Sequence, residues 1–294
     1  MKISINSKEF QILEKLGKGG NGQVFLAYNK EENKNYAIKA ILIKDLDEED
    51  KIFIENEAKI LSNFTDANNH IVKYYGATKD NESFYILMEF CESLDLKKFI
   101  RESKSLIDEN IAYKIVNEIC LGIREIHKRN IIHRDLKPEN IFIDKNNDIK
   151  IGDFGISRQL SNTKKYSKSS IGTLNYMAPE VVKGEDYNTK VDIWDFGCII
   201  YELLTLKICF EGKDLSSIPK ILSGKHGTID INKYNPKWQD LINLLLKMDY
   251  KERPDIEWVY NFIRKELNPD NKIIKCPEKK TIFSIVRKKN KYIF

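Results

Sequence analysis

The sequence contains few cysteines and no pattern that uses them. Five occur among 294 residues, they are scattered, and no Cys-x-x-Cys pair is present. An odd number of scattered cysteines argues against a disulfide framework and favours reduced thiols, as in cytosolic or nuclear proteins. Because zinc-binding cysteines usually come in closely spaced pairs, we also expect no zinc site.

Long apolar runs are missing as well. No segment approaches the roughly 20 consecutive apolar residues that span a bilayer, and Met1–Asn6 lacks the apolar stretch of a signal peptide. We therefore expect a cytoplasmic protein, with the nucleus as the alternative. Internal repeats are also absent. Contents of 41% hydrophobic and 32% charged residues are typical of globular domains, and the length suits one large domain or two lobes.

Positive charge is concentrated near the C-terminal end. The whole chain carries a net charge of +5, but eight Lys and Arg against two acids give +6 from Leu267 onward, which leaves −1 for residues 1–266. We expect a near-neutral domain over 1–266 and a basic tail over 267–294. A basic tail can contact nucleic acid, membranes or acidic partners. A solvated, weakly ordered terminus is the simpler interpretation.

Apolar periodicity predicts mainly strands up to about residue 90 and mainly helices beyond it. Phe10–Ile41 and Phe84–Phe90 alternate in the manner of strands. Asp47–Phe64 instead carries an apolar stripe at helical spacing. The later expected elements are a helix that ends at Asn130, a hairpin around Lys145–Asn147, a helix over Val191–Leu204, and helices centred on Leu241–Met248 and Ile256–Leu267.

Five short motifs follow one another along the chain. Each is a weak signal alone, because short motifs occur by chance, but all five in this order are not a coincidence. Together they resemble the motif set of eukaryotic protein kinases. They are Gly17-Lys18-Gly19-Gly20-Asn21-Gly22, Tyr36-Ala37-Ile38-Lys39, His133-Arg134-Asp135, Asp153-Phe154-Gly155 and Ala178-Pro179-Glu180.

The kinase resemblance implies a bilobal α+β fold and an ATP- and Mg²⁺-dependent reaction on protein substrates. A small lobe of five strands and one helix would extend to about residue 90, and a larger, mainly helical lobe would cover about 91–266. Phosphoryl transfer needs positioning and charge neutralisation more than covalent chemistry. The glycines at 17, 19 and 22 would let a strand-turn-strand backbone approach the phosphates closely.

Lys39 is expected to hold the α- and β-phosphates while paired with Glu57. Glu57, unlike Glu55, lies on the apolar stripe of its predicted helix, where an acid needs a cationic partner. The connector Glu89–Cys91 would supply backbone hydrogen bonds to adenine. The residues expected to contact ATP are Leu16, Gly17, Lys18, Gly19, Gly20, Asn21, Gly22, Val24, Ala37, Lys39, Met88, Glu89, Cys91, Phe142 and Asp153.

The resemblance also assigns the reacting and metal-binding groups. Asp135 would accept the proton of the substrate hydroxyl, with Lys137 and Thr173 beside it. Asn140 and Asp153 would hold Mg²⁺ through oxygen ligands. Lys137, two residues after the catalytic aspartate, and Thr173 are both typical of serine/threonine kinases.

Several polar residues are expected to support this machinery without taking part in it. Asp192 interrupts an apolar helix and needs hydrogen bonds there. The kinase resemblance implies that its carboxylate accepts hydrogen bonds from backbone amides of the His133–Asp135 loop. Arg253 would pair with Glu180. The histidines at 70, 127 and 226 fit no chemical role.

Arg134 is typical of kinases that phosphorylation of the activation loop controls. A phosphate on this loop would give Arg134 a bidentate partner and order the segment. Ser169, four residues before Thr173, is the expected site, with Ser167 and Ser170 as alternatives.

Within the family, the sequence is most similar to the NIMA-related (Nek) group, through His70–Tyr75, Leu87–Cys91 and Asp192–Lys207. Gly172-Thr173-Leu174 instead resembles the kinases of the translation initiation factor, which stay an alternative. A pseudokinase, which binds nucleotide or protein without turnover, is a second alternative. Such proteins usually lack one of the residues Lys39, Asp135 and Asp153, all of which are present here.

Overall fold

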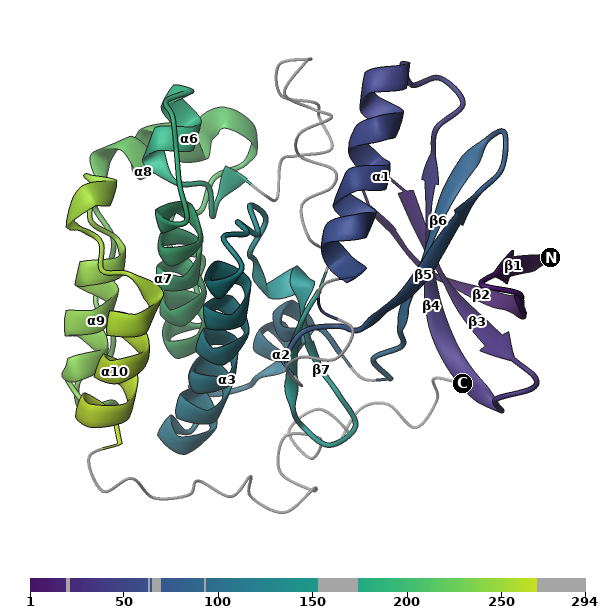
Figure 1. The fold of residues 1–294 in the computed structure, drawn as a ribbon. Helices are drawn as coiled ribbons and strands as arrows, with labels where there is room; N and C mark the ends of the chain where they lie inside the picture. The colour runs from purple at the N-terminus through teal and green to yellow at the C-terminus, as the bar shows by residue number, and fades with distance from the viewer. Residues whose placement is uncertain (20–21, 63, 65–69, 93, 153–173, 269–294) are drawn as a thin grey trace. The chain divides into compact units, whose positions relative to one another are not determined.

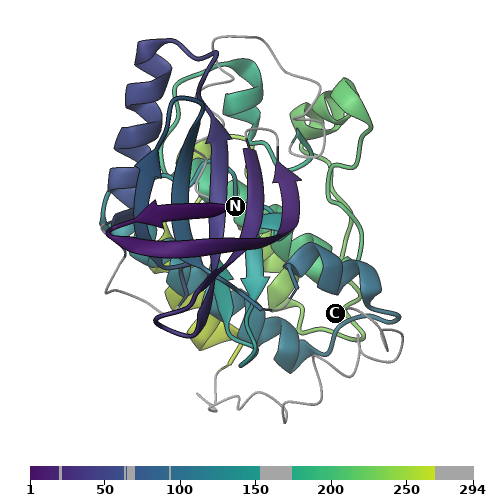
Figure 2. The ribbon, with the colours of Figure 1, turned by 90° about the vertical axis from the view of Figure 1, so that its right-hand side faces the viewer.

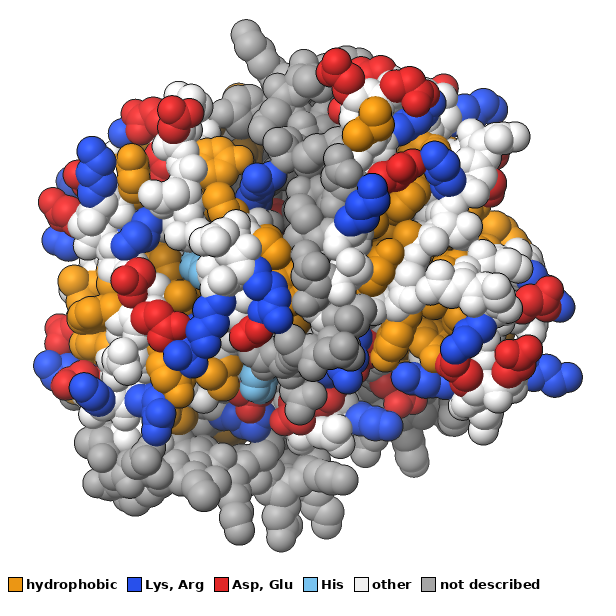
Figure 3. Space-filling view, viewed as in Figure 1, with side chains coloured by type: hydrophobic (Ala, Val, Ile, Leu, Met, Phe, Trp, Pro, Cys, Tyr) orange, Lys and Arg blue, Asp and Glu red, His pale blue; other side chains and the backbone are white. Residues whose placement is uncertain are grey.

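The computed structural model describes residues 1–19, 22–62, 64, 70–92, 94–152 and 174–268. These residues divide into two compact units, residues 1–92 and the residues from 93 onward. The first unit contains mainly strands and the second mainly helices (Figure 1). The predicted α+β class is therefore confirmed. On the surface, acidic and basic side chains are interspersed over both units (Figure 3).

The first unit holds a six-stranded antiparallel sheet in the order β1-β2-β3-β4-β6-β5. Five strands were predicted, so that count is wrong. The additional strand is β1 (Lys2–Ile5), in which Ile3 and Ile5 are buried and alternate with exposed polar residues. The other strands are β2 (Lys8–Gly19), β3 (Gly22–Asn29), β4 (Lys34–Leu42), β5 (Tyr74–Lys79) and β6 (Ser83–Glu89).

One face of this sheet is covered by an aromatic and aliphatic core. β1 contributes both of its isoleucines to this core. The rings of Phe10 and Tyr36 meet edge to face at 5.3 Å, and Tyr36 meets Tyr75 at the same distance. The helix predicted over Asp47–Phe64 is present as α1 (Glu48–Ser62), which lies beside β5 (Figure 1).

The two end strands of the sheet, β1 and β5, approach each other (Figure 2). Asn6 follows β1 and donates a hydrogen bond from Nδ2 to the carbonyl oxygen of Tyr75, at 2.9 Å. Gly76, which follows Tyr75 in β5, has a φ of +153°. A Cβ atom on Gly76 would lie 2.5 Å from Asn6 Nδ2. Glycine therefore satisfies the backbone conformation and the close approach together.

We expect Gly76→Ala to destabilise the chain by about 2–4 kcal/mol, from backbone strain and the displaced Asn6 hydrogen bond. Gly17→Ala is the matched control, because a Cβ atom at Gly17 would meet nothing within 4 Å. Thermal and urea unfolding of both variants measures the difference. Equal losses in the two variants would contradict the role given to Gly76.

In the second unit, four helices pack side by side (Figure 1). Each matches a predicted helix to within a few residues. α7 is buried along nearly its whole length. Its Trp194 ring stacks on Phe210 with 5.2 Å between centroids. The four are α3 (Glu109–Lys128), α7 (Lys190–Thr205), α9 (Lys237–Leu245) and α10 (Ile256–Glu266).

Shorter elements complete the second unit. The predicted hairpin is present as β7 (Ile141–Ile143) paired antiparallel with β8 (Ile149–Ile151). No described helix is long and apolar enough to cross a membrane. The remaining elements among the described residues are the helices α2 (Leu96–Glu102), α6 (Pro179–Lys183) and α8 (Ile218–Ser223), and the 3₁₀ turns η1 (Pro138–Asn140), η3 (Asp214–Ser217) and η4 (Tyr250–Glu252).

Candidate active site

The loop between α3 and β7 brings three of the predicted residues together. Lys137 Nζ lies 2.8 Å from Oδ2 of Asp135. The turn η1 then returns the chain, so that Asn140 Nδ2 donates to the Asp135 carbonyl oxygen at 2.8 Å and to its Oδ2 at 3.0 Å. Oδ2 of Asp135 therefore contacts both the Lys137 ammonium and the Asn140 side-chain amide. The Asp135 side chain is mostly buried.

The same contacts leave the side-chain oxygen of Asn140 suited to a cation. Its Nδ2 is engaged by Asp135, whereas Oδ1 accepts no hydrogen bond from the residues that the structure describes. Mg²⁺ prefers oxygen ligands of this kind. Among the described residues, no group of three His, Cys, Asp or Glu side chains could hold a metal by itself. The second predicted ligand, Asp153, lies outside the described residues.

His133 ties this loop to the end of β8. Its Nδ1 accepts the backbone N–H of Asp135 at 3.3 Å, and its Nε2 lies 3.1 Å from the carbonyl oxygen of Gly152. Gly152 in turn donates its N–H to the Asn140 carbonyl oxygen at 2.9 Å. The residue immediately before the Asp-Phe-Gly segment is therefore bonded to the loop between α3 and β7.

Asp192 holds the loop from α7, as predicted. Its carboxylate accepts the N–H of His133 at 2.9 Å and the N–H of Arg134 at 3.0 Å. Arg134 has a φ of +68°, a strained conformation for a side chain of this size. Such strain persists only where the surroundings fix it, and the two amide bonds to Asp192 supply that constraint.

A histidine that sequence reasoning left without a role completes this arrangement. His127 Nε2 lies 2.8 Å from Oδ2 of Asp192. Burial alone raises the pKa of the Asp192 carboxyl, but His127 and the loop amides outweigh it, so the pKa lies below its ordinary value. A signal was available, because His127 follows Ile119 and Ile123 at intervals of four residues, on the buried stripe of α3.

In the first unit, strand register gathers predicted ATP-binding residues on one face of the sheet. Val24 of β3 stands opposite Gly17 on one side and Lys39 on the other. Ala37 stands opposite Met88. Because positions two apart on a strand share a face, Ala37 and Lys39 both point away from the core that contains Tyr36 and Ile38. Both are buried.

The glycine motif forms the predicted antiparallel pair, with Gly19 opposite Gly22. A Cβ atom at Gly22 would lie 2.4 Å from the carbonyl oxygen of Ala40, so packing itself requires glycine there. Gly17 has no such neighbour and leaves its backbone open to a ligand. The tip of the turn, Gly20 and Asn21, lies outside the described residues.

The structure describes the side chain of only one of the two acids weighed as partners of Lys39. Glu55 pairs with Lys79 at the surface, with 2.6 Å between charged atoms, as expected for an acid off the apolar stripe. The Glu57 side chain is outside the described part of the chain, so its pairing with Lys39 stays a prediction. The assignments of Thr173 and of the loop serines at 167, 169 and 170 also fall on residues outside the described ranges.

Arg253 and Glu180 form the predicted pair. Arg253 Nη1 and Nη2 donate to the two Glu180 oxygens at 2.7 and 2.8 Å, and both side chains are almost completely buried. Further donations from Arg253 go to the carbonyl oxygens of Lys190 and Lys247, at 3.0 and 2.8 Å. The Arg253 guanidinium also lies 4.9 Å from the ring centroid of Trp194. The Ala-Pro-Glu segment is thereby fixed to the helices of the second unit.

Comparison with known families decides the identity of this fold. The sequence matches the protein kinase domain over residues 10–262. The chain belongs to the protein kinase family. This kinase domain is 35% identical over 259 residues to mouse serine/threonine-protein kinase Nek1, with 87% of the chain and 21% of the relative covered.

Other relatives give the same group. The kinase domain is 35% identical over 266 residues to the probable serine/threonine-protein kinase nek2 of Dictyostelium discoideum, with 87% of the chain and 63% of the relative covered. It is 32% identical over 272 residues to human Nek5, with 89% and 38% covered. The predicted similarity to the Nek group is confirmed. The chain spans about a fifth to two thirds of the length of these relatives.

Proposed function

We propose that this kinase domain transfers the γ-phosphate of ATP to serine and threonine hydroxyls of protein substrates. The observation that carries the proposal is the Asp135 carboxylate, held against Lys137 and Asn140 in a loop that Asp192 fixes. A pseudokinase has no need of such an arrangement. The names of the relatives support the serine/threonine class, as does Lys137 two residues after Asp135.

In this mechanism, Asp135 positions the substrate hydroxyl and accepts its proton as the oxygen attacks the γ-phosphorus. The bond from that phosphorus to the departing ADP oxygen breaks in the same displacement. Lys137 stays beside the Asp135 carboxylate and offers its ammonium to the transferring phosphoryl group. Asn140 would hold Mg²⁺ together with Asp153, and the bound metal supplies further neutralisation of phosphate charge.

ATP binding is assigned to the first unit and to Phe142. Lys39 would contact the α- and β-phosphates. The backbone at Gly17, which has no side chain in the way, would approach the same phosphates closely. Val24, Ala37 and Phe142 would enclose the adenine. The N–H of Glu89 already donates to the Lys73 carbonyl oxygen at 2.8 Å, so Glu89 would offer adenine its carbonyl group.

We assign regulation and location on sequence grounds. Phosphorylation of Ser169 would give Arg134 a charged, bidentate partner and would order the activation loop. We propose a cytoplasmic location, in keeping with the scattered cysteines. The basic residues from 267 onward are proposed as a solvated tail.

Transfer of radiolabelled γ-phosphate from ATP to a peptide library tests the proposed activity. We expect label on serine and threonine but not on tyrosine, and loss of transfer when excess chelator removes Mg²⁺. Phosphoamino-acid analysis provides the readout. Tight ATP binding without any transfer would instead favour a pseudokinase, and label on tyrosine would overturn the serine/threonine assignment.

A further inference from the structure

Two cysteines of the second unit lie beside each other near the end of α7. Cys198 is in the helix and is completely buried, whereas Cys209 follows the helix and is partly exposed. Both are free thiols, and their side chains hydrogen-bond to each other. The proposed transfer of phosphate uses neither of them. Two thiols in contact, one of them within reach of solvent, are the starting arrangement for a disulfide.

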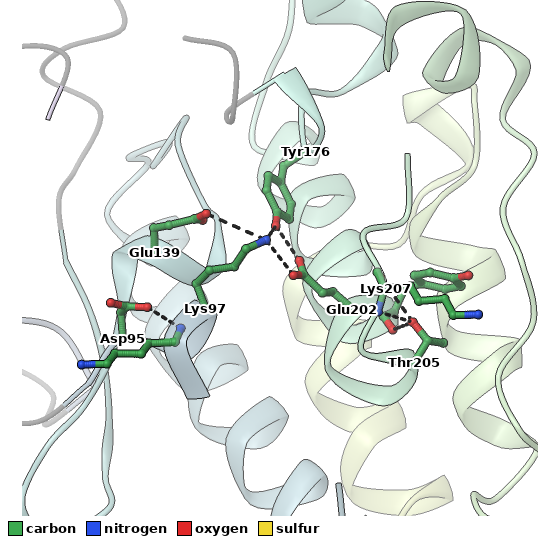
Figure 4. Close-up of polar contacts among 9 residues, drawn as sticks. Asp95, Lys97, Glu139, Tyr176, Glu202, Thr205 and Lys207 are labelled. Carbon is green, nitrogen blue, oxygen red and sulfur yellow. Dashed lines mark hydrogen bonds and ion pairs between the residues drawn. The ribbon is translucent and has the colours of Figure 1, made fainter. Parts of the chain in front are cut away.

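The contact follows from the way in which the chain reverses after α7. Leu206 has a φ of +59°, a left-handed conformation of the kind that ends helices. Thr205 Oγ1 accepts the N–H of Lys207 at 3.2 Å, and Figure 4 shows these two residues bonded at the end of α7. The chain therefore turns back along the helix that it has just left.

A ring contact shows where the returning chain lies. Phe210, the neighbour of Cys209, stacks on Trp194 with 5.2 Å between ring centroids and 9° between ring planes. Trp194 and Cys198 are four residues apart on α7 and therefore share one face of the helix. The packing of Phe210 thus places Cys209 near Cys198 independently of the contact between the sulfurs.

The segment that carries Cys209 also bonds to the segment before the Ala-Pro-Glu motif. Gly212 donates its N–H to Oδ1 of the buried Asn175 at 3.1 Å. Asn175 follows Thr173, which is expected beside the proposed catalytic base, by two positions. A Cβ atom on Gly212 would lie 2.2 Å from the backbone nitrogen of Ser217. This tight packing leaves the segment little room to absorb a displacement.

We propose that Cys198 and Cys209 form a redox modification site, which a peroxide closes to a disulfide, and that closure weakens the binding of peptide substrate. A disulfide brings its sulfurs to about 2.0 Å, far closer than hydrogen-bonded thiols lie. Cys209 makes this movement, because Cys198 is fixed in a buried helix. The bond from Gly212 to Asn175 then lengthens. The effect on peptide binding rests on the proposed function, whereas disulfide formation does not.

The reaction balances with hydrogen peroxide as the oxidant. The Cys209 sulfur attacks one peroxide oxygen, the O–O bond breaks, water leaves with the Cys209 proton, and Cys209 becomes a sulfenic acid. The Cys198 sulfur then attacks the Cys209 sulfur, the S–O bond breaks, and the oxygen leaves as a second water with the Cys198 proton. The thiols have lost two electrons, which reduce the peroxide. Burial raises the pKa of the Cys198 thiol, which leaves the first attack to Cys209.

Mass spectrometry of the peroxide-treated full chain tests the disulfide. Trypsin cleaves after Lys207, so the two cysteines fall on different peptides. We expect an unreduced digest to contain these peptides joined, and dithiothreitol to separate them. Cys209→Ser should leave Cys198 unlinked. Cys91→Ser is the matched control, because Cys91 is also partly exposed, and this variant should keep the link.

Peptide kinetics test the consequence of closure. A chain with Cys91→Ser and Cys276→Ser retains the pair and, besides it, only the buried Cys120. Oxidation of this chain should raise KM for a threonine peptide about threefold, the effect of losing one weak hydrogen bond. Dithiothreitol should restore KM. The same chain with Cys209→Ser added should not respond to peroxide.

Three results would count against the inference. Native chain in which Cys198 and Cys209 stay unlinked after peroxide, or in which Cys209 proceeds to a sulfinic acid, would remove the pair as a modification site. A disulfide that leaves peptide KM unchanged would defeat its control of substrate binding. No transfer by the reduced chain would defeat the proposed function and that control together, while the digest would still decide whether the disulfide forms.

Discussion

Asp135→Asn is expected to lower kcat by about 10²- to 10⁴-fold, because the variant keeps the shape of the side chain but cannot accept the hydroxyl proton. ATP affinity should change little, since Asp135 contacts Lys137 and Asn140 of its own loop. Steady-state transfer to a threonine peptide, together with ATP binding by calorimetry, measures the two quantities separately.

Asp240→Asn on the surface of α9 is the matched control and should leave kcat within about twofold, because surface substitutions rarely matter.

Asp153→Asn should also abolish transfer, through weaker Mg²⁺ binding. The double variant with Asp135→Asn should be no slower than the worse single variant, because both residues serve one transition state. Retained turnover in Asp135→Asn would remove its assignment as the base.

Arg253→Met is expected to lower the free energy of unfolding by about 3–5 kcal/mol. The substitution leaves the Glu180 carboxylate buried without its cation and removes a donor from the carbonyl oxygens of Lys190 and Lys247. Urea unfolding followed by tryptophan fluorescence is a suitable measurement, because Trp194 lies beside the pair.

Lys247→Met provides the comparison, since it removes an exposed ion pair with Glu252 at 3.8 Å and should change stability by less than about 1 kcal/mol. Replacing both partners, Arg253→Met with Glu180→Met, should recover part of the loss, because the uncompensated buried charge is gone. A double variant less stable than Arg253→Met alone would contradict this explanation.

Local periodicity predicted the long elements and missed two short ones. The helices α3 and α7 span several turns, so their apolar spacing is statistically clear. β1 has four residues and α2 has seven, too few for either period to stand out. Ile3 and Ile5 of β1 pack in one core cluster with Phe10 and Tyr36. Tertiary packing of this kind stabilises a short strand and cannot be read from the few residues around it in the sequence.

Site prediction divides along a similar line. Contiguous motifs located the loop around Asp135 and the strand that carries Lys39, because these chemical groups are close in sequence. Lys97 of α2 donates to Glu202 of α7, 105 positions away, and a single sequence gives no signal for such a pair. Arg253 was paired with Glu180, 73 positions away, only through family resemblance.

The meeting of β1 with β5 bears on self-association. An exposed edge strand presents unpaired N–H and C=O groups that a second chain can extend, and this is a common route to aggregation. Here the two end strands of the sheet turn toward each other, and Asn6 bonds to the backbone of β5. Residues 1–7 therefore lie against β5, the end strand of the sheet. A chain shortened at this end would present β5 to a second copy of itself, even with its catalytic loop intact.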